Sequence, residues 1–241
     1  MHIDTSIGRN FVRIYVENVV IFCHGLPYDP GSVIEKSYDQ LARFFTDRGL
    51  DSVIFDFSGC GLSRGDFSLT AWVEDLLNIV SGFSKVDLVG FSMGGVAATY
   101  VAASLDNVRN LVLVASPCCT DSVSEEILSK IYLNARSKSV LRGIGSYESF
   151  VSKLRNELEE YAPIKWIDSV RKPVLIVHGT NDDVISYESA EALFESARQP
   201  KYLLKVINGD HRLRKEKAVM EYILSWLKKK KSGKVIEEIQ L

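Results

Sequence analysis

Short runs of apolar residues recur along the chain, separated by longer stretches in which apolar residues repeat at helical spacing. Most of the runs are continuous and rich in β-branched residues, which is typical of strands buried on both faces of a parallel sheet. They cover residues 19–23, 52–57, 86–91, 111–115, 174–178 and 202–207. A further run at 11–16 predicts an antiparallel strand, either at an edge or in a hairpin closed by Glu17-Asn18.

Helical patterns fill the intervals between these strands. The predicted helices lie at 38–45, 71–80, 97–105, 188–197 and 217–227. Gly49 follows the first of them as a stop residue, and the lysine run 228–231 follows the last, where cations complement the helix dipole. Strands that alternate with helices predict an α/β fold, a mostly parallel sheet flanked by helices, over one domain of residues 1–241.

One stretch, residues 117–171, breaks the alternation. It holds two amphipathic helical patterns and no convincing strand. An insertion between core strands commonly covers the carboxyl edge of the sheet, so we expect a small helical lid here, with extra scaffold helices as the alternative. Its apolar positions are the expected lining of an acyl or aryl pocket, namely Ile127, Ile131, Tyr132 and Phe150.

Composition and charge are those of an ordinary globular domain. The chain has 241 residues, 46% of them hydrophobic and 25% charged, with a formal net charge of -2. This balance gives no reason to expect a nucleic-acid or membrane partner. The first residues lack a signal-peptide pattern and no apolar run is long enough to span a bilayer, so the sequence predicts a cytoplasmic protein.

The four cysteines do not have the spacing of a metal site. Cys118 and Cys119 are adjacent, which makes them poor disulfide partners because neighbouring side chains rarely reach the required geometry. We therefore expect reduced thiols in a reducing compartment.

Candidate chemistry begins at Gly90-Phe91-Ser92-Met93-Gly94. This Gly-x-Ser-x-Gly pattern directly follows a predicted strand and directly precedes a predicted helix of small residues. That context is required of a nucleophile elbow, in which a strained turn lifts the serine hydroxyl clear of the backbone. The helix N-terminus behind Ser92 also favours developing negative charge.

A serine hydroxyl is a weak nucleophile unless a base removes its proton. Of the four histidines, His211 lies in a loop after the last predicted strand, at the same sheet edge as Ser92. The third member must be a carboxylate between them in chain order, and Asp182 and Asp183 both follow the strand 174–178. The residues alone favour Asp182 over Asp183 without excluding either.

An oxyanion formed at this serine needs two hydrogen-bond donors. The backbone N–H of Met93, which follows the nucleophile, is the first candidate. The loop His24-Gly25-Leu26-Pro27 follows the first predicted core strand and supplies the second. Because proline has no N–H, the candidate there is Leu26.

Taken together these segments resemble the α/β-hydrolase superfamily over nearly the whole chain. The matching segments, in the family's order, are His24-Gly25, residues 56–63, the elbow at Ser92, residues 178–182 and Gly209-Asp210-His211. The resemblance implies that Asp182 is the acid, because the family's acid stands three residues after the glycine that follows the strand. The compact length is most similar to small carboxylesterases, of the feruloyl or cinnamoyl esterase-like group or the monoacylglycerol lipase-like group.

The resemblance implies a serine hydrolase that acts on a small-molecule ester without a metal or organic cofactor. Thioester, amide or peptide, and carbon–carbon hydrolysis use the same three residues and stay open, as does a non-catalytic binding protein on this fold. Ser92 argues against the relatives with an aspartate or cysteine nucleophile. A homodimer is left open.

Overall fold

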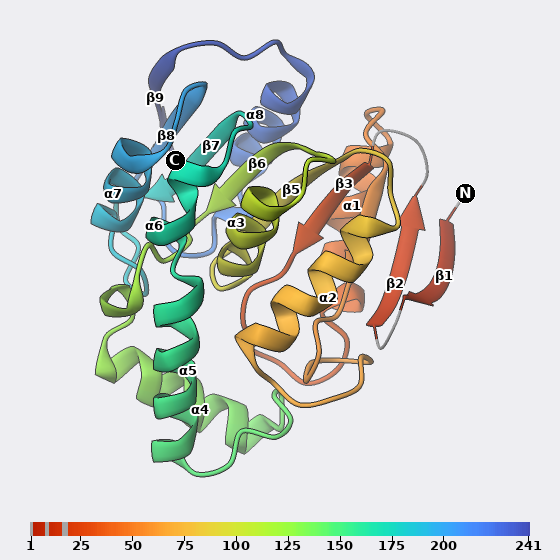
Figure 1. Cartoon of the computed structure of the whole chain (residues 1–241), viewed down its shortest axis with the longest axis vertical. Helices are drawn as coiled ribbons and strands as arrows, with labels where there is room; N and C mark the ends of the chain where they lie inside the picture. Colours follow the sequence, from red (N-terminus) through yellow and green to blue (C-terminus); the bar gives the residue numbers. More distant parts are fainter. Residues whose placement is uncertain (1, 8–9, 16–18) are drawn as a thin grey trace.

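The computed structural model of the chain describes residues 2–7, 10–15 and 19–241. In these ranges the strands form one sheet in the order β1-β2-β4-β3-β5-β6-β7-β8-β9 (Figure 1). The strands from β3 to β9 pair in parallel, and β2 is antiparallel to both of its neighbours. The strands are β1 (His2–Ile7), β2 (Asn10–Tyr15), β3 (Val19–Cys23), β4 (Ser52–Phe55), β5 (Val86–Phe91), β6 (Val108–Val114), β7 (Val174–Gly179), β8 (Lys201–Ile207) and β9 (Lys234–Gln240).

The predicted α/β fold is confirmed, and the apolar runs at its centre are strands. The predicted place of the strand at 11–16 is wrong. Although β2 is antiparallel as expected, it lies between β1 and β4, so it is neither an edge strand nor a hairpin partner of β3. The remaining residues of that prediction, Val16, Glu17 and Asn18, lie outside the described ranges. The strands β1 and β9 were not predicted.

Helices cover both faces of the sheet. On one face lie α2 (Leu69–Ser81), α3 (Gly94–Ser104) and α7 (Glu188–Ser196), and on the other α1 (Asp39–Thr46) and α8 (Lys217–Lys228). Side chains alternate along β5, so that Leu88 joins the first apolar cluster and Val89 the second. This burial on both faces explains why the central strands are continuously apolar.

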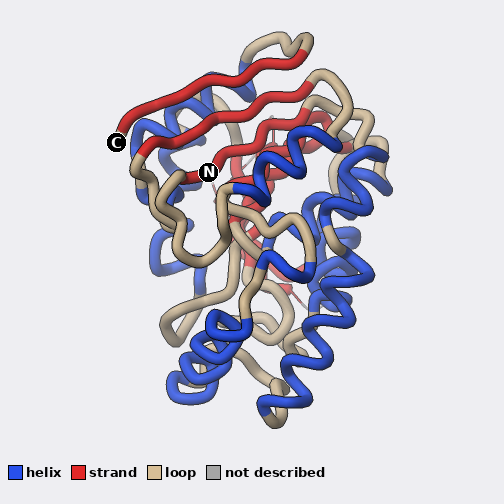
Figure 2. Tube along the Cα trace, turned by 90° about the vertical axis from the view of Figure 1, so that its left-hand side faces the viewer, coloured by secondary structure: helices blue, strands red, loops and turns tan. Residues whose placement is uncertain are grey.

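The segment between β6 and β7 is helical, in the place where the insertion was predicted. It contains η2 (Thr120–Ser122), α4 (Glu125–Lys138), α5 (Tyr147–Tyr161), α6 (Pro163–Trp166) and η3 (Ile167–Ser169). The hydroxyls of Ser124 and Ser146 accept backbone N–H groups and so begin α4 and α5. These two helices lie at the lower end of the molecule in Figures 1 and 2.

Arg142, in the loop between α4 and α5, joins this insertion to the loop that follows β4. Its guanidinium donates to the carbonyls of Cys60 (3.2 Å), Gly61 (3.0 Å) and Ser63. Its own backbone carbonyl accepts the Phe67 N–H at 2.8 Å. The insertion is therefore fixed to the core away from its two ends. Within the described ranges, no helix is long and apolar enough to cross a bilayer.

Candidate active site

Ser92 lies in a sharp turn between β5 and α3. Its backbone has φ 48°, in the left-handed region that is unfavourable for a residue with a side chain. Two glycines make the turn fit: a Cβ on Gly90 would lie 2.6 Å from the Gly95 Cα, and one on Gly94 would lie 2.3 Å from the Cys23 carbonyl oxygen. The predicted strand–turn–helix context of the serine is thus present, together with the strain that lifts its hydroxyl.

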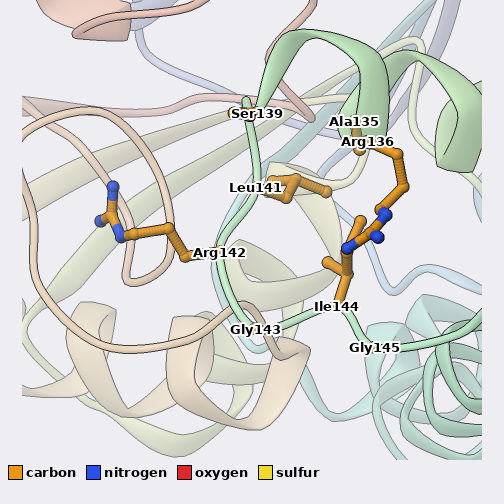
Figure 3. A pocket seen from close by; sticks show the side chains of 8 residues that line it. All are labelled: Ala135, Arg136, Ser139, Leu141, Arg142, Gly143, Ile144 and Gly145. Atoms are coloured by element: carbon orange, nitrogen blue, oxygen red, sulfur yellow. The ribbon is translucent and has the colours of Figure 1, made fainter.

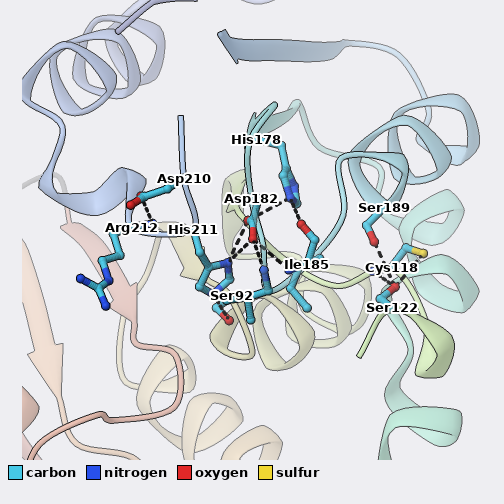
Figure 4. A network of polar contacts seen from close by, with 11 residues as sticks. Ser92, Cys118, Ser122, His178, Asp182, Ile185, Ser189, Asp210, His211 and Arg212 are labelled. Carbon is cyan, nitrogen blue, oxygen red and sulfur yellow. Dashed lines mark hydrogen bonds and ion pairs between the residues drawn. The ribbon is translucent and has the colours of Figure 1, made fainter. Parts of the chain in front are cut away.

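The side chains of Ser92, His211 and Asp182 form a continuous hydrogen-bonded chain (Figure 4). The His211 Nε2 lies 3.0 Å from the Ser92 Oγ, and its Nδ1 lies 2.8 Å from the Asp182 Oδ2. Asp182 follows β7 and His211 follows β8. The three residues meet because the carboxyl ends of parallel strands share one edge of the sheet.

Asp182 is held as a carboxylate. Its side chain is buried, and its Oδ1 accepts the backbone N–H groups of Val184 and Ile185, both at 2.9 Å. Burial acts to raise the pKa of Asp182, but hydrogen bonds from His178 and His211 and the charge of His211 outweigh it, so the pKa lies well below its ordinary value. The group therefore stays ionised and able to stabilise a positive charge on His211.

His178 supports Asp182 and was not predicted to do so. Its Nε2 lies 3.2 Å from the Asp182 Oδ2 and 2.9 Å from the Ile185 carbonyl oxygen, and its side chain is buried. The sequence signal was its place at the end of the strand that carries Asp182, four residues before it. Asp183, by contrast, is exposed.

The loop after β3 lies directly against the serine. A Cβ added to Gly25 would come within 3.0 Å of the Ser92 Cβ. In the described part of the chain, neither the Leu26 N–H nor the Met93 N–H has a hydrogen-bond acceptor. Within that part of the chain both N–H groups are therefore free to donate, and their role as oxyanion donors stays a prediction.

The ring of His24 fixes the shape of this loop. Its Nε2 accepts the Phe57 N–H at 2.9 Å, which leaves the ring proton on Nδ1, 2.6 Å from the Gly25 carbonyl oxygen. Burial lowers the pKa of His24, so the ring is neutral, as these two hydrogen bonds require.

The four predicted pocket residues lie in the insertion, and their contact with substrate stays a prediction. Ile127, Ile131 and Tyr132 are half-buried against the main core, and Phe150 is buried, with its ring centroid 5.6 Å from that of Tyr132. A cavity of about 320 Å³ lies beside the end of α4 (Figure 3), and none of these four residues lines it. It is lined by Ala135, Arg136, Ser139, Leu141, Arg142, Gly143, Ile144 and Gly145.

A mainly parallel sheet with a strained serine elbow at its carboxyl edge defines the α/β-hydrolase class. The chain belongs to the alpha/beta hydrolase family, whose model matches residues 20–218. Among curated proteins it is similar to the uncharacterized protein YqkD of Bacillus subtilis, at 28% identity over 207 residues. That match covers 80% of this chain, and the chain spans 65% of the length of the relative.

Solved structures share the fold at low sequence identity. A mutant of the meta-cleavage product hydrolase CumD from Pseudomonas fluorescens IP01 is 18% identical with a TM-score of 0.70, covering 90% of this chain and 94% of that one. The monoacylglycerol lipase of Paleococcus ferrophilus is 18% identical with a TM-score of 0.68, covering 87% and 93%. At these identities the likeness is one of fold.

Proposed function

We propose that this chain is a serine hydrolase that cleaves carboxylic esters of small or medium acyl or aryl groups through an acyl-enzyme intermediate. Ser92 is the nucleophile, His211 the general base and Asp182 the residue that orients the imidazole. The observation that carries the proposal is the hydrogen-bonded chain from the Ser92 Oγ through His211 to Asp182, with steps of 3.0 and 2.8 Å.

The geometry suits the two half-reactions of acyl transfer. His211 Nε2 takes the hydroxyl proton as the Ser92 Oγ attacks the ester carbonyl, and the N–H groups of Leu26 and Met93 bind the oxyanion. His211 then returns the proton to the leaving alcohol, and a water molecule repeats the sequence to release the acid. The ionised Asp182 stabilises the imidazolium that forms in each half.

The insertion acts in this proposal as a lid over the acyl or aryl site, with Ile127, Ile131, Tyr132 and Phe150 against the substrate. Its position after β6 supports this role, because β6 pairs with the strand that carries Ser92. A cytoplasmic location is part of the proposal. It is supported by Cys23, Cys60, Cys118 and Cys119, all of which are free thiols.

The proposal is tested by hydrolysis of p-nitrophenyl esters of increasing acyl length, with fluorophosphonate labelling of Ser92. Ser92→Ala is expected to abolish both labelling and turnover while leaving the fold intact. Ser104→Ala is the matched control, because its exposed hydroxyl lies at the other end of α3 and donates to the Tyr100 carbonyl of the same helix. Turnover that survives in Ser92→Ala contradicts the proposal.

Labelling without ester turnover would keep Ser92 as the nucleophile and contradict the choice of esters. The same variants would then be assayed on thioesters, amides and carbon–carbon substrates. Carbon–carbon cleavage is included because one solved structure of the same fold is described as a meta-cleavage product hydrolase.

A further inference from the structure

Two neighbouring thiols lie at the start of the insertion, outside the site described above. The Sγ atoms of Cys118 and Cys119 are 2.8 Å apart. Even carbon atoms, which are smaller than sulfur, prefer separations of ~3.5–4.0 Å. Although both cysteines are free thiols and were predicted to be poor disulfide partners, the local backbone brings their sulfurs into direct contact.

One hydroxyl group holds this pair. The Ser122 Oγ accepts the backbone N–H groups of Cys118 (3.1 Å) and Cys119 (3.2 Å) and lies 3.2 and 3.3 Å from their sulfurs. It also accepts a hydrogen bond from the Ser189 Oγ at 3.0 Å (Figure 4). Ser189 is the second residue of α7, the helix that follows the loop of Asp182, so the thiol pair is linked by hydrogen bonds to the segment that carries Asp182.

The two thiols differ in access. Cys118 is buried at 7% exposure and Cys119 is half-buried, so a small reagent reaches Cys119 first. Burial and the contact with Cys119 raise the pKa of Cys118, which disfavours its attack on a reagent in solution. The other thiols, Cys23 and Cys60, are buried.

We propose that Cys118 and Cys119 are a modification site, a vicinal dithiol that small-molecule disulfides oxidise reversibly. The Cys119 thiolate attacks one sulfur of the reagent, the reagent's S–S bond breaks and one small thiol leaves. The Cys118 sulfur then attacks the Cys119 Sγ, closing the protein disulfide and releasing the second small thiol. The two protons of the cysteines leave with the two thiols, so the reaction is balanced.

Closing this bond displaces the start of the insertion. The trans peptide bond holds adjacent Cα atoms ~3.8 Å apart, less than the ~4.4–6.8 Å that disulfides usually span. The disulfide ring therefore closes only when the torsion angles between the two cysteines rotate to a strained arrangement. That rotation withdraws the two N–H groups from Ser122. Because Ser122 ends η2, which leads into α4, oxidation is coupled to the position of the proposed lid.

The test is to treat the full chain with oxidised glutathione and follow its mass. Both cysteines fall in the tryptic peptide 110–130, away from Cys23 and Cys60. We expect that peptide to lose two hydrogens in the parent chain. Cys118→Ser should stop at the mixed disulfide on Cys119, Cys119→Ser should stay unmodified, and Ser122→Ala should oxidise severalfold more slowly. A stable glutathione adduct on the parent, or no reaction, overturns the proposal.

Ester turnover is the second readout, and it rests on the proposed function. Oxidation should lower kcat/KM severalfold, dithiothreitol should restore it, and Cys118→Ser/Cys119→Ser should show neither effect. An oxidised chain with unchanged kcat/KM overturns the coupling to the lid. Because the mass readout needs no catalysis, failure of the hydrolase proposal and failure of the thiol proposal remain distinguishable.

Discussion

At the scale of single residues, the clearest contrast is between Asp182 and Asp183. They are adjacent in the sequence, yet the side chain of Asp182 is buried and accepts hydrogen bonds from two histidines, while Asp183 is exposed. The sequence alone left both open, because which carboxylate turns inward depends on the loop. The N–H groups of Val184 and Ile185, which bond the Asp182 Oδ1, decide it here.

This contrast gives a matched pair of variants. Asp182→Asn should lower kcat for ester hydrolysis by about 10³–10⁴, because an amide no longer stabilises the imidazolium and presents an N–H where His211 needs an acceptor. Asp183→Asn should stay close to the parent. Steady-state kinetics on one p-nitrophenyl ester measure both. A kcat close to the parent value in Asp182→Asn would show that the carboxylate contacts described for Asp182 do not matter for turnover.

At the scale of elements, strands that are buried on both faces could be predicted from the sequence, whereas the exposed strand β9 could not. The central strands are apolar on both faces and were found. Strand β9 was missed because its side chains are mostly exposed and its alternation is broken by Glu237-Glu238. It is recognised as a strand by its backbone pairing with β8 and not by a periodic apolar pattern.

The residues of the candidate site were likewise predicted only where a recognisable strand pattern precedes them. Ser92, Asp182 and His211 were predicted because each follows a recognisable strand, and parallel strands bring such positions to one edge. The supporting role of the His178 ring was not predicted. Its partners depend on the fold of the loop between Asp182 and Ile185, for which the sequence holds no periodic signal.

The attachment of the insertion is tested at Arg142. Arg142→Ala should lower the free energy of unfolding by about 1–2 kcal/mol, because several carbonyls lose a charged hydrogen-bond donor. The value is small because the guanidinium is partly exposed and water weakens these interactions. Arg136→Ala is the control: Arg136 lines the same cavity and is exposed, and within the described residues its side chain has no hydrogen bond or ion pair. Urea unfolding measures both, and equal stability of the two variants would contradict this attachment.

At the scale of the whole molecule, the loop after β3 (residues 24–27) and the hydrophobic core both contact one buried ring, that of His24. His24 contacts Gly25 on the side of Ser92, and its ring packs edge-on against Phe57 and Trp72, with centroids 5.0 and 5.3 Å apart. Trp72 belongs to α2 and is fully buried. Any charge on His24 would therefore disturb the site and the core together.

This arrangement predicts how stability depends on pH. Burial lowers the pKa of His24 from its ordinary value of 6.5, so below that pH the unfolded chain binds a proton that the folded chain does not. The free energy of unfolding should fall as pH drops through about 6.5 and on toward the lowered pKa, at up to ~1.4 kcal/mol per pH unit for one histidine. Urea unfolding between about pH 7.5 and pH 5.5 measures the slope. His24→Gln keeps an acceptor for the Phe57 N–H but binds no proton, so its slope should be shallower. A variant and a parent with the same slope would show that His24 is not the group responsible.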